Sequence, residues 1–171
     1  LKMKTMMMGL MAALTVSAAT PALAKPVAEW VDQTTGHRVL RLPDTPGSAS
    51  LYFHQNSYTP QGDKMVISTP DGISVLTLAD WSIRPLVKGK DIQLLFTGRK
   101  TRTAYYASHR RDDGAGATTL YAADIDSGKV RKIATVDRGS IGSINADETL
   151  LLGQWAASDK PLQPDGTQKR A

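Results

Sequence analysis

Three histidines are the natural candidates for acid–base or metal chemistry in this sequence, because it contains no cysteine. They are His37, His54 and His109, and they lie far apart along the chain. Sequence signatures of metal sites place their ligands at close, regular spacings, which these histidines lack. The absence of cysteine also excludes thiol catalysis, cysteine-based metal sites and a disulfide scaffold. Spacing alone therefore identifies no metal ligand and no catalytic residue.

One histidine stands in a run of hydrogen-bonding side chains, His54-Gln55-Asn56. An imidazole and two amides offer several donors and acceptors to a polar ligand. The alternative is a histidine satisfied by backbone partners at the end of a strand. His37 follows a Thr-Gly turn signal and His109 opens a polar loop, so we expect both at the surface. His54, Gln55 and Asn56 are therefore the candidate substrate-binding residues.

The composition is that of an ordinary soluble domain, with 171 residues, 41% hydrophobic, 22% charged and a mean hydropathy of −0.26. These values exclude a multi-span membrane protein and a disordered polyelectrolyte. The formal net charge is +5, and part of it comes from Lys2 and Lys4 near the start of the chain. So mild an excess does not indicate a nucleic-acid-binding protein.

Residues 1–24 have the order of a secretory signal peptide. Lys2 and Lys4 precede the uncharged run Met6–Val16, and the small-residue pattern Ala22-Leu23-Ala24 follows it. The apolar run is too short to span the ~30 Å hydrocarbon core of a membrane. We therefore expect cleavage after Ala24, a periplasmic or secreted mature chain, and no membrane association beyond the signal peptide.

The rest of the chain consists of short apolar or β-branched runs bounded by Gly, Pro, Asp or Asn, and no window sustains a helical period. The predicted strands are Arg38–Leu42, Leu51–Tyr58, Lys64–Thr69, Ile73–Leu78, Ile83–Val87, Ile92–Thr97, Thr103–Ser108, Thr119–Asp124, Lys129–Thr135, Ser140–Ile144 and Thr149–Gln154. The fold class is therefore all-β.

These strands recur in a repeat. Val75–Val87 and Ala122–Ala134 align without a gap, each as strand, tight turn and strand. The turn-plus-strand segment Tyr58–Ile67 recurs at Ile144–Leu152, about two repeats of 40–45 residues later, which is the length of a β-propeller blade. A β-sandwich would explain the strands but not the repeat. We predict a partial propeller of about two and a half four-stranded blades, with Leu51–Tyr58 as an inner strand that carries His54 to the central channel.

The predicted organisation is a signal peptide (1–24), N-terminal blades (25–155) and a polar tail (156–171). A propeller closes with about four to eight blades, more than this length supplies. We therefore expect the chain to be the front end of a longer protein or the product of a truncated gene.

Other side chains could also contact a ligand, and the candidates are Arg38, Arg41, Arg99, Lys100, Arg102, Trp30, Trp81 and Trp155. Basic clusters attract anionic ligands over a distance, although clusters on turns are usually only solvated. Tryptophan rings can stack on sugars, although we expect these three to fill the gaps between blades. No Gly-x-Ser-x-Gly elbow and no phosphate-binding glycine loop occurs.

The mature sequence resembles the N-terminal part of oligogalacturonate lyases. The resemblance is carried by Thr35–Leu42, Gly47–Asn56 and Tyr58–Lys64, and it continues through Ile73–Gly89, Ile92–Val136 and Gly139–Leu150. It implies a seven-bladed propeller that cleaves short, unsaturated oligogalacturonates from pectin by β-elimination. It also implies a divalent metal, typically manganese, on a histidine-rich site, with a histidine base and an arginine nearby.

None of those family residues matches a position in this sequence, so the resemblance assigns no catalytic residue and no metal ligand here. We expect this chain alone to be inactive, with His54, Gln55 and Asn56 as possible contacts to an acidic sugar. The alternative is a non-catalytic periplasmic propeller of the TolB-like kind that binds a protein or a glycan. More blades with clustered histidines, encoded downstream, would favour the lyase.

Overall fold

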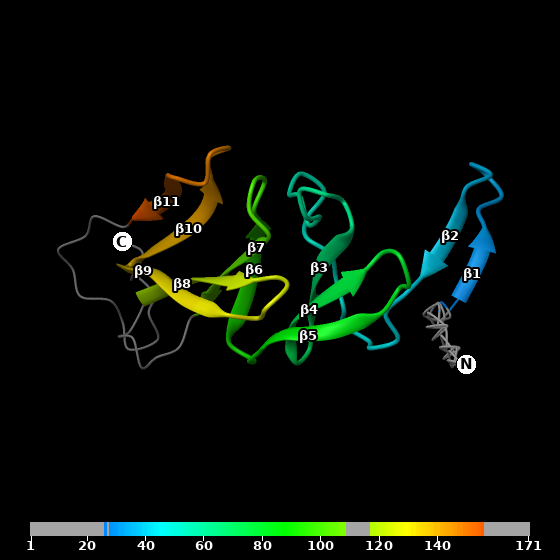
Figure 1. The fold of residues 1–171 in the computed structure, drawn as a ribbon, viewed down its shortest axis with the longest axis horizontal. Helices are drawn as coiled ribbons and strands as arrows, with labels where there is room; N and C mark the ends of the chain where they lie inside the picture. The colour runs from blue at the N-terminus through cyan, green and yellow to red at the C-terminus, as the bar shows by residue number, and fades with distance from the viewer. Residues whose placement is uncertain (1–25, 27, 109–116, 156–171) are drawn as a thin grey trace, which may run out of the picture.

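The computed structural model describes residues 26, 28–108 and 117–155. Within these ranges the regular structure consists of strands joined by turns, as the sequence predicts (Figure 1). The expected signal peptide, His109 and the polar tail lie outside the described residues. No helix in the described ranges is long and apolar enough to cross a membrane.

Four antiparallel sheets follow one another along the chain (Figure 1). The strands are β1 (Ala28–Val31), β2 (Arg38–Arg41), β3 (Lys64–Thr69), β4 (Gly72–Thr77), β5 (Ile83–Lys88), β6 (Ile92–Thr97), β7 (Thr103–Ser108), β8 (Ala117–Asp124), β9 (Val130–Asp137), β10 (Gly139–Ile144) and β11 (Leu151–Trp155). They pair as β1-β2, β3-β4-β5, β6-β7-β8-β9 and β10-β11. We call the last three sheets the first, second and third blades, and β1–β2 the N-terminal hairpin.

This arrangement is the all-β, partial propeller that the repeat predicts. The second blade has its four strands in chain order, and β6, its first strand, contacts β3 of the first blade and β10 of the third. In a propeller the first strand of each blade lies at the central channel and the chain then runs outward. On this basis β6 and β10 are inner strands.

The predicted inner strand Leu51–Tyr58 is not continuous, so that prediction is wrong in its middle. Ala49 bridges to Ser68 of β3, and Tyr58 bridges to Met65. The stretch from Ala49 to Tyr58 is longer than the stretch of β3 between these two bridges. The surplus residues must therefore leave the sheet, and they form a turn closed by a hydrogen bond from Gln55 N to Tyr52 O (2.8 Å). We call residues 50–56 the inner loop.

The hydrophobic core lies on both faces of the second blade. One cluster joins it to the first blade and includes Val66, Val75 and Leu94. The other includes Leu95 and Leu120, and residues of β10 and β11 pack against it. Neighbours such as Leu94 and Leu95 belong to opposite clusters because successive side chains of a strand point to opposite faces. The second blade is therefore buried on both sides.

Candidate functional site

A cleft of about 170 Å³ lies where the inner loop meets the inner strands of the second and third blades. Its lining residues are His54, Gln55, Asn56, Phe96, Thr97, Arg99, Gly142, Ser143 and Ile144. The first three come from the inner loop, Phe96 and Thr97 end β6, and the last three belong to β10. Three segments far apart in sequence therefore meet at one position, and all three predicted binding residues lie there. We call this position the inner cleft.

Two hydrogen bonds of the Asn56 side chain stabilise the conformation of the inner loop. The Asn56 side chain accepts a hydrogen bond from Tyr58 N (3.1 Å) and donates one to Tyr58 O (3.0 Å). Both ends of its amide are thus occupied, so Asn56 acts as a brace for the loop. His54 is exposed and Gln55 is half-buried. Of the three predicted binding residues, His54 and Gln55 are therefore the ones available to a ligand.

Two aromatic residues of the inner loop are displayed to solvent. Phe53 is 85% exposed and Tyr52 is also exposed. The Tyr52 and Phe53 rings lie 4.5 Å apart between centroids, and the His54 ring meets each of them edge-on. Exposed aromatic rings provide flat apolar surfaces for a ligand with one apolar face, such as a sugar. Nothing in the sequence marks these two residues as exposed, because a Leu-Tyr-Phe run indicates a buried strand.

Thr97 supplies a buried hydroxyl at the cleft. The residue is 2% exposed, and its Oγ1 has no hydrogen-bond partner among the described residues. A buried polar group without a partner costs about 1–3 kcal/mol, and most such groups in proteins are paired. This hydroxyl is therefore a candidate for binding a ligand in the cleft.

The basic patch Arg99-Lys100-Arg102 contains two residues that form ion pairs and one that forms none with another described residue. Lys100 pairs with Asp147, and Arg102 pairs with Asp63 and Asp126. Arg99 is exposed, lines the inner cleft, and has no hydrogen bond or ion pair to another described residue. A guanidinium is always charged and its fork of N–H donors matches a carboxylate. Arg99 is thus the cation of this patch that is available to an anionic ligand.

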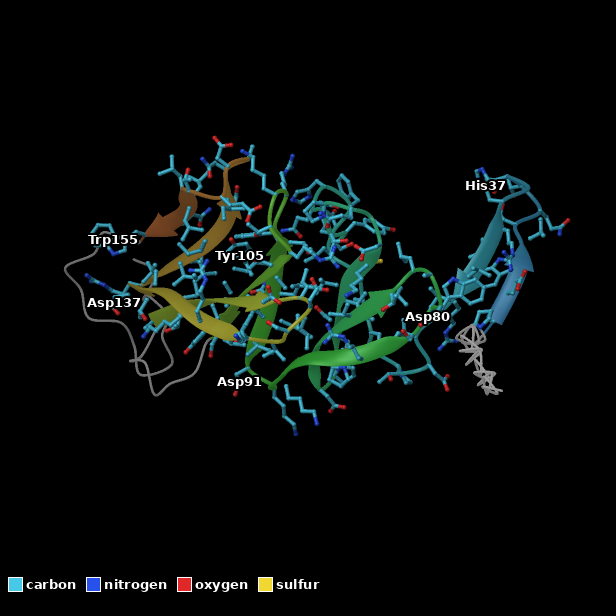
Figure 2. The ribbon with its side chains drawn as sticks, in the orientation of Figure 1. His37, Asp80, Asp91, Tyr105, Asp137 and Trp155 are labelled. Atoms are coloured by element: carbon cyan, nitrogen blue, oxygen red, sulfur yellow. The ribbon has the colours of Figure 1, made fainter. Side chains whose placement is uncertain are left out.

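The remaining candidates lie elsewhere. His37 is in the turn of the N-terminal hairpin, at the end of the molecule far from Tyr105 (Figure 2). Arg38 pairs with Glu29 in the same hairpin. The prediction that the tryptophans fill gaps between blades is wrong for two of them. Trp30 and Trp155 are exposed because each lies on a two-stranded sheet over which the described part of the chain places no further blade.

The described residues contain no set of side chains that could bind a metal ion. Over residues 28–108 and 117–155, no three His, Cys, Asp or Glu side chains lie close enough together to hold an ion. His54 is the single residue of these types among those that line the inner cleft. The residues described here therefore do not fit a protein-bound divalent metal.

Comparison with known proteins identifies the fold. No protein-family model and no curated protein matches the sequence. An oligogalacturonate lyase from Vibrio parahaemolyticus is similar over 75% of this chain, with 23% identity and a TM-score of 0.60. An oligogalacturonate lyase in complex with manganese is similar over 76%, with 20% identity and a TM-score of 0.58. Each match spans 37% of the lyase chain, well under two thirds of its length. This chain therefore has the partial propeller fold of the corresponding region of oligogalacturonate lyases.

Proposed function

We propose that this chain provides an acidic-sugar-binding face of a propeller that acts on short oligogalacturonates, in the manner of the lyases whose fold it shares. The observation that carries the proposal is that Arg99 and Thr97 line the same cleft, and that neither the Arg99 guanidinium nor the Thr97 hydroxyl has a partner among the described residues. A galacturonate residue offers a carboxylate and ring hydroxyls to these two groups.

Each group in the cleft has a binding role that suits such a sugar. The Arg99 guanidinium pairs with the carboxylate, and charge-assisted bonds of this kind are about twice as strong as neutral ones. The Thr97 hydroxyl and the Gln55 amide can each donate to or accept from a ring hydroxyl. Tyr52 and Phe53 cover the apolar face of the neighbouring sugar ring. An oligosaccharide bound in the cleft would extend over the inner loop, which borders it.

The reaction proposed for the longer protein is a β-elimination. A base removes the proton on C5 of a galacturonate, next to the carboxylate. The electron pair of the C5–H bond forms a C4=C5 double bond, and the oxygen on C4 leaves with the electron pair of the broken C4–O bond. Negative charge builds on the carboxylate in the transition state, and a fixed cation beside it lowers the barrier. Arg99 is placed to bind and orient such a carboxylate. The described residues contain no set of side chains that could hold a metal ion for this reaction.

The location proposed for this activity is the periplasm or the exterior, since residues 1–24 have the order of a signal peptide. An exported protein without cysteine cannot misform disulfides in an oxidising compartment.

The test is binding of trigalacturonate to the full chain, measured by isothermal titration calorimetry at low salt. We expect Arg99→Ala to weaken binding at least tenfold, since one charge-assisted pair is worth about 1.5–3 kcal/mol. Arg41→Ala is the matched control, because Arg41 is another exposed arginine but lies on β2, away from the cleft. We expect the control to bind as the parent does.

A neutral galactose trisaccharide provides the second comparison. If the carboxylate is the group that Arg99 recognises, the neutral sugar binds weakly and Arg99→Ala does not change its affinity. Equal affinity for the acidic and the neutral sugar, or equal loss in both arginine variants, would contradict the proposal.

A further inference from the structure

Besides Thr97, one other buried hydroxyl lacks a hydrogen-bond partner among the described residues, that of Ser108 at the end of β7. Ser108 is 3% exposed, so its hydroxyl is removed from bulk water. The register pairs it with Ile92, the first residue of β6, whereas Thr97 is the last residue of that strand. Five steps of about 3.4 Å put Ile92 about 17 Å from Thr97. The two hydroxyls therefore lie at opposite ends of the second blade, and Ser108 does not belong to the inner cleft.

A second cleft, of about 350 Å³, lies beside Ser108 where the first and second blades meet. One wall is the end of β5 with the connection that leads to β6, and the other wall is the face of the second blade. Asp91 marks this end of the blade at the lower edge of Figure 2. Both walls belong to blades that the structure describes. We call this position the junction cleft. The residues that could contact a ligand there are Lys88, Lys90, Asp91, Tyr106, Ser108 and Tyr121.

The charges of the junction cleft suit a monoanion. Lys88 and Lys90 are exposed, and neither forms an ion pair with another described residue. Asp91 lines the same cleft, so two cations and one anion leave a net charge of one positive unit. A carboxylate balances that charge. A phosphate monoester carries about −1.5 to −2 at neutral pH and would bring a further negative charge toward Asp91.

The second blade supplies an aromatic ring and a hydroxyl. Tyr106 of β7 and Tyr121 of β8 lie directly opposite each other, and their rings are stacked with centroids 5.3 Å apart. Tyr106 is buried and Tyr121 is half-buried, so Tyr121 is the ring that a ligand can reach. Ser108 lies two residues from Tyr106 and therefore on the same face of β7. A ligand that fits these groups has a ring with one apolar face and a hydroxyl at its rim.

We propose that the junction cleft binds a sugar acid, with its carboxylate beside Lys88 and Lys90, its ring over Tyr121 and a ring hydroxyl hydrogen-bonded to Ser108. A serine hydroxyl can both donate to and accept from a sugar hydroxyl. The volume of the cleft is within the range of about 300–1,000 Å³ that small-molecule sites occupy. No residue lines both this cleft and the inner cleft, so the site does not depend on the proposed function.

The first test is a titration of the full chain, isotope-labelled at its glycines, with D-galacturonate under nuclear magnetic resonance. Gly89 lines the junction cleft and Gly142 lines the inner cleft, so their amide signals report the two positions separately. We expect the Gly89 signal to shift with a saturable dependence on D-galacturonate. The neutral methyl ester should bind more weakly because it lacks the carboxylate, and glucose 6-phosphate should bind more weakly because of Asp91.

Two variants then test the assigned groups. Lys90→Gln removes one charge and should weaken binding about twofold to fivefold, as expected for an exposed ion pair. Ser108→Ala removes the hydroxyl and should weaken binding about twofold to tenfold, as expected for one hydrogen bond. Lys129→Gln is the matched control, because Lys129 is an exposed lysine in the β8–β9 turn and lines neither cleft. All three variants must keep the far-ultraviolet circular dichroism of the parent chain.

A Gly89 signal that does not move, or that moves equally with the methyl ester, overturns the junction cleft as a sugar-acid site. Tighter binding of glucose 6-phosphate overturns the choice of a monoanion. Equal affinity in Lys90→Gln, Ser108→Ala and the control overturns the assignment of the groups. The Gly142 signal keeps this result apart from the proposed function, since a Gly142 shift that Arg99→Ala abolishes supports the inner cleft whatever Gly89 does.

Discussion

At the scale of single residues, Arg102 is the side chain that ties the first and second blades together electrostatically. Its guanidinium donates to both carboxylate oxygens of Asp63 (2.7 and 2.9 Å) in the first blade. It also donates to Asp126 (2.5 Å), which Lys64 contacts too, and to Gln61 (2.6 Å). This bidentate contact fixes the orientation of the Arg102 guanidinium relative to the Asp63 carboxylate and also pairs their charges. Arg102 is thus a structural residue, in contrast to Arg99 three positions earlier.

This cluster predicts that stability falls in acid. Hydrogen bonds from Arg102 and then from Lys64 lower the pKa of Asp126 from 3.8 to about 2, and Arg102 lowers the pKa of Asp63 well below its ordinary value. A carboxylate with a lowered folded pKa contributes stability above its unfolded pKa and loses it as the pH falls through the folded value. We therefore expect the midpoint of urea unfolding to decrease between pH 4 and pH 2.

Asp126→Asn should flatten that decrease, while Asp91→Asn should not, because Asp91 is exposed and has no hydrogen bond to another described residue. The effect is modest, since the Asp126 side chain is 44% exposed and exposed ion pairs are screened by water. A parent and an Asp126→Asn variant with the same acid slope would show that the cluster is not the cause.

Thr97 permits a prediction that separates ligand binding from stability. Its buried Oγ1 has no partner in the described chain, so Thr97→Val should leave stability unchanged or raise it by up to about 1 kcal/mol. The same variant should weaken trigalacturonate binding in calorimetry. Thr119→Val is the contrast, because the Thr119 hydroxyl is hydrogen-bonded to that of Thr135 (3.1 Å) and its loss should destabilise the chain. A Thr97→Val variant that unfolds more easily would indicate a structural hydroxyl.

At the scale of the elements, most strands follow from the period of the sequence, and two places do not. Lys64–Thr69, Ile92–Thr97 and Thr103–Ser108 are strands with the predicted bounds because their apolar side chains pack on the core. Strand β1 is missed because all of its residues are exposed, so it has no buried face to impose a pattern. The inner loop is misread as a strand because Tyr52 and Phe53 are apolar yet exposed.

Part of the inner cleft could be predicted from the sequence. His54, Gln55 and Asn56 are adjacent in sequence and polar, so they stand out, and Arg99 stands out as part of a basic turn. Thr97 and Ser143 carry no such signal, because they are ordinary strand residues that meet the loop only when three blades pack. The assignment of Arg99 rather than Arg102 as the free cation also depends on contacts between blades.

The β3–β4 hairpin depends on one glycine. Gly72 has φ +137°, and a Cβ added there would lie 2.2 Å from the Val87 carbonyl oxygen of β5. Gly72→Ala must therefore shift the β4–β5 pairing, and we expect it to lower the free energy of unfolding by more than about 2 kcal/mol. Gly62→Ala is the control, since Gly62 has φ +67° but no atom within 4 Å of its added Cβ.

The control should cost about 1 kcal/mol, the price of the left-handed backbone alone. Urea unfolding of both variants gives the comparison. Equal losses in Gly72→Ala and Gly62→Ala would mean that the backbone conformation, and not the close approach to β5, limits the hairpin.

At the scale of the whole molecule, the second blade is the part on which the others depend. Its two faces form the two hydrophobic clusters, one shared with the first blade and one with the third. The third blade is also held by Glu148, whose carboxylate accepts hydrogen bonds from the backbone of Lys100 (2.6 Å) and Thr101 (3.0 Å). The N-terminal hairpin contributes to neither cluster. Folding should therefore be cooperative across the three blades and should exclude the hairpin.

The last prediction tests this cooperativity with Leu120→Ala. Leu120 is fully buried on β8, in the cluster between the second and third blades. Removing a buried leucine side chain costs about 2–5 kcal/mol. Val130→Ala, at an exposed position of β9 in the same blade, should cost less than about 0.5 kcal/mol. Because the second blade supports both neighbours, Leu120→Ala should lower the urea midpoint equally when followed by circular dichroism and by the fluorescence of Trp81, which lies in the β4–β5 turn of the first blade. The fluorescence is measured in a Trp30→Phe, Trp155→Phe background, so that Trp81 is the tryptophan observed. A midpoint that shifts in circular dichroism alone would show that the first blade unfolds independently of the other two.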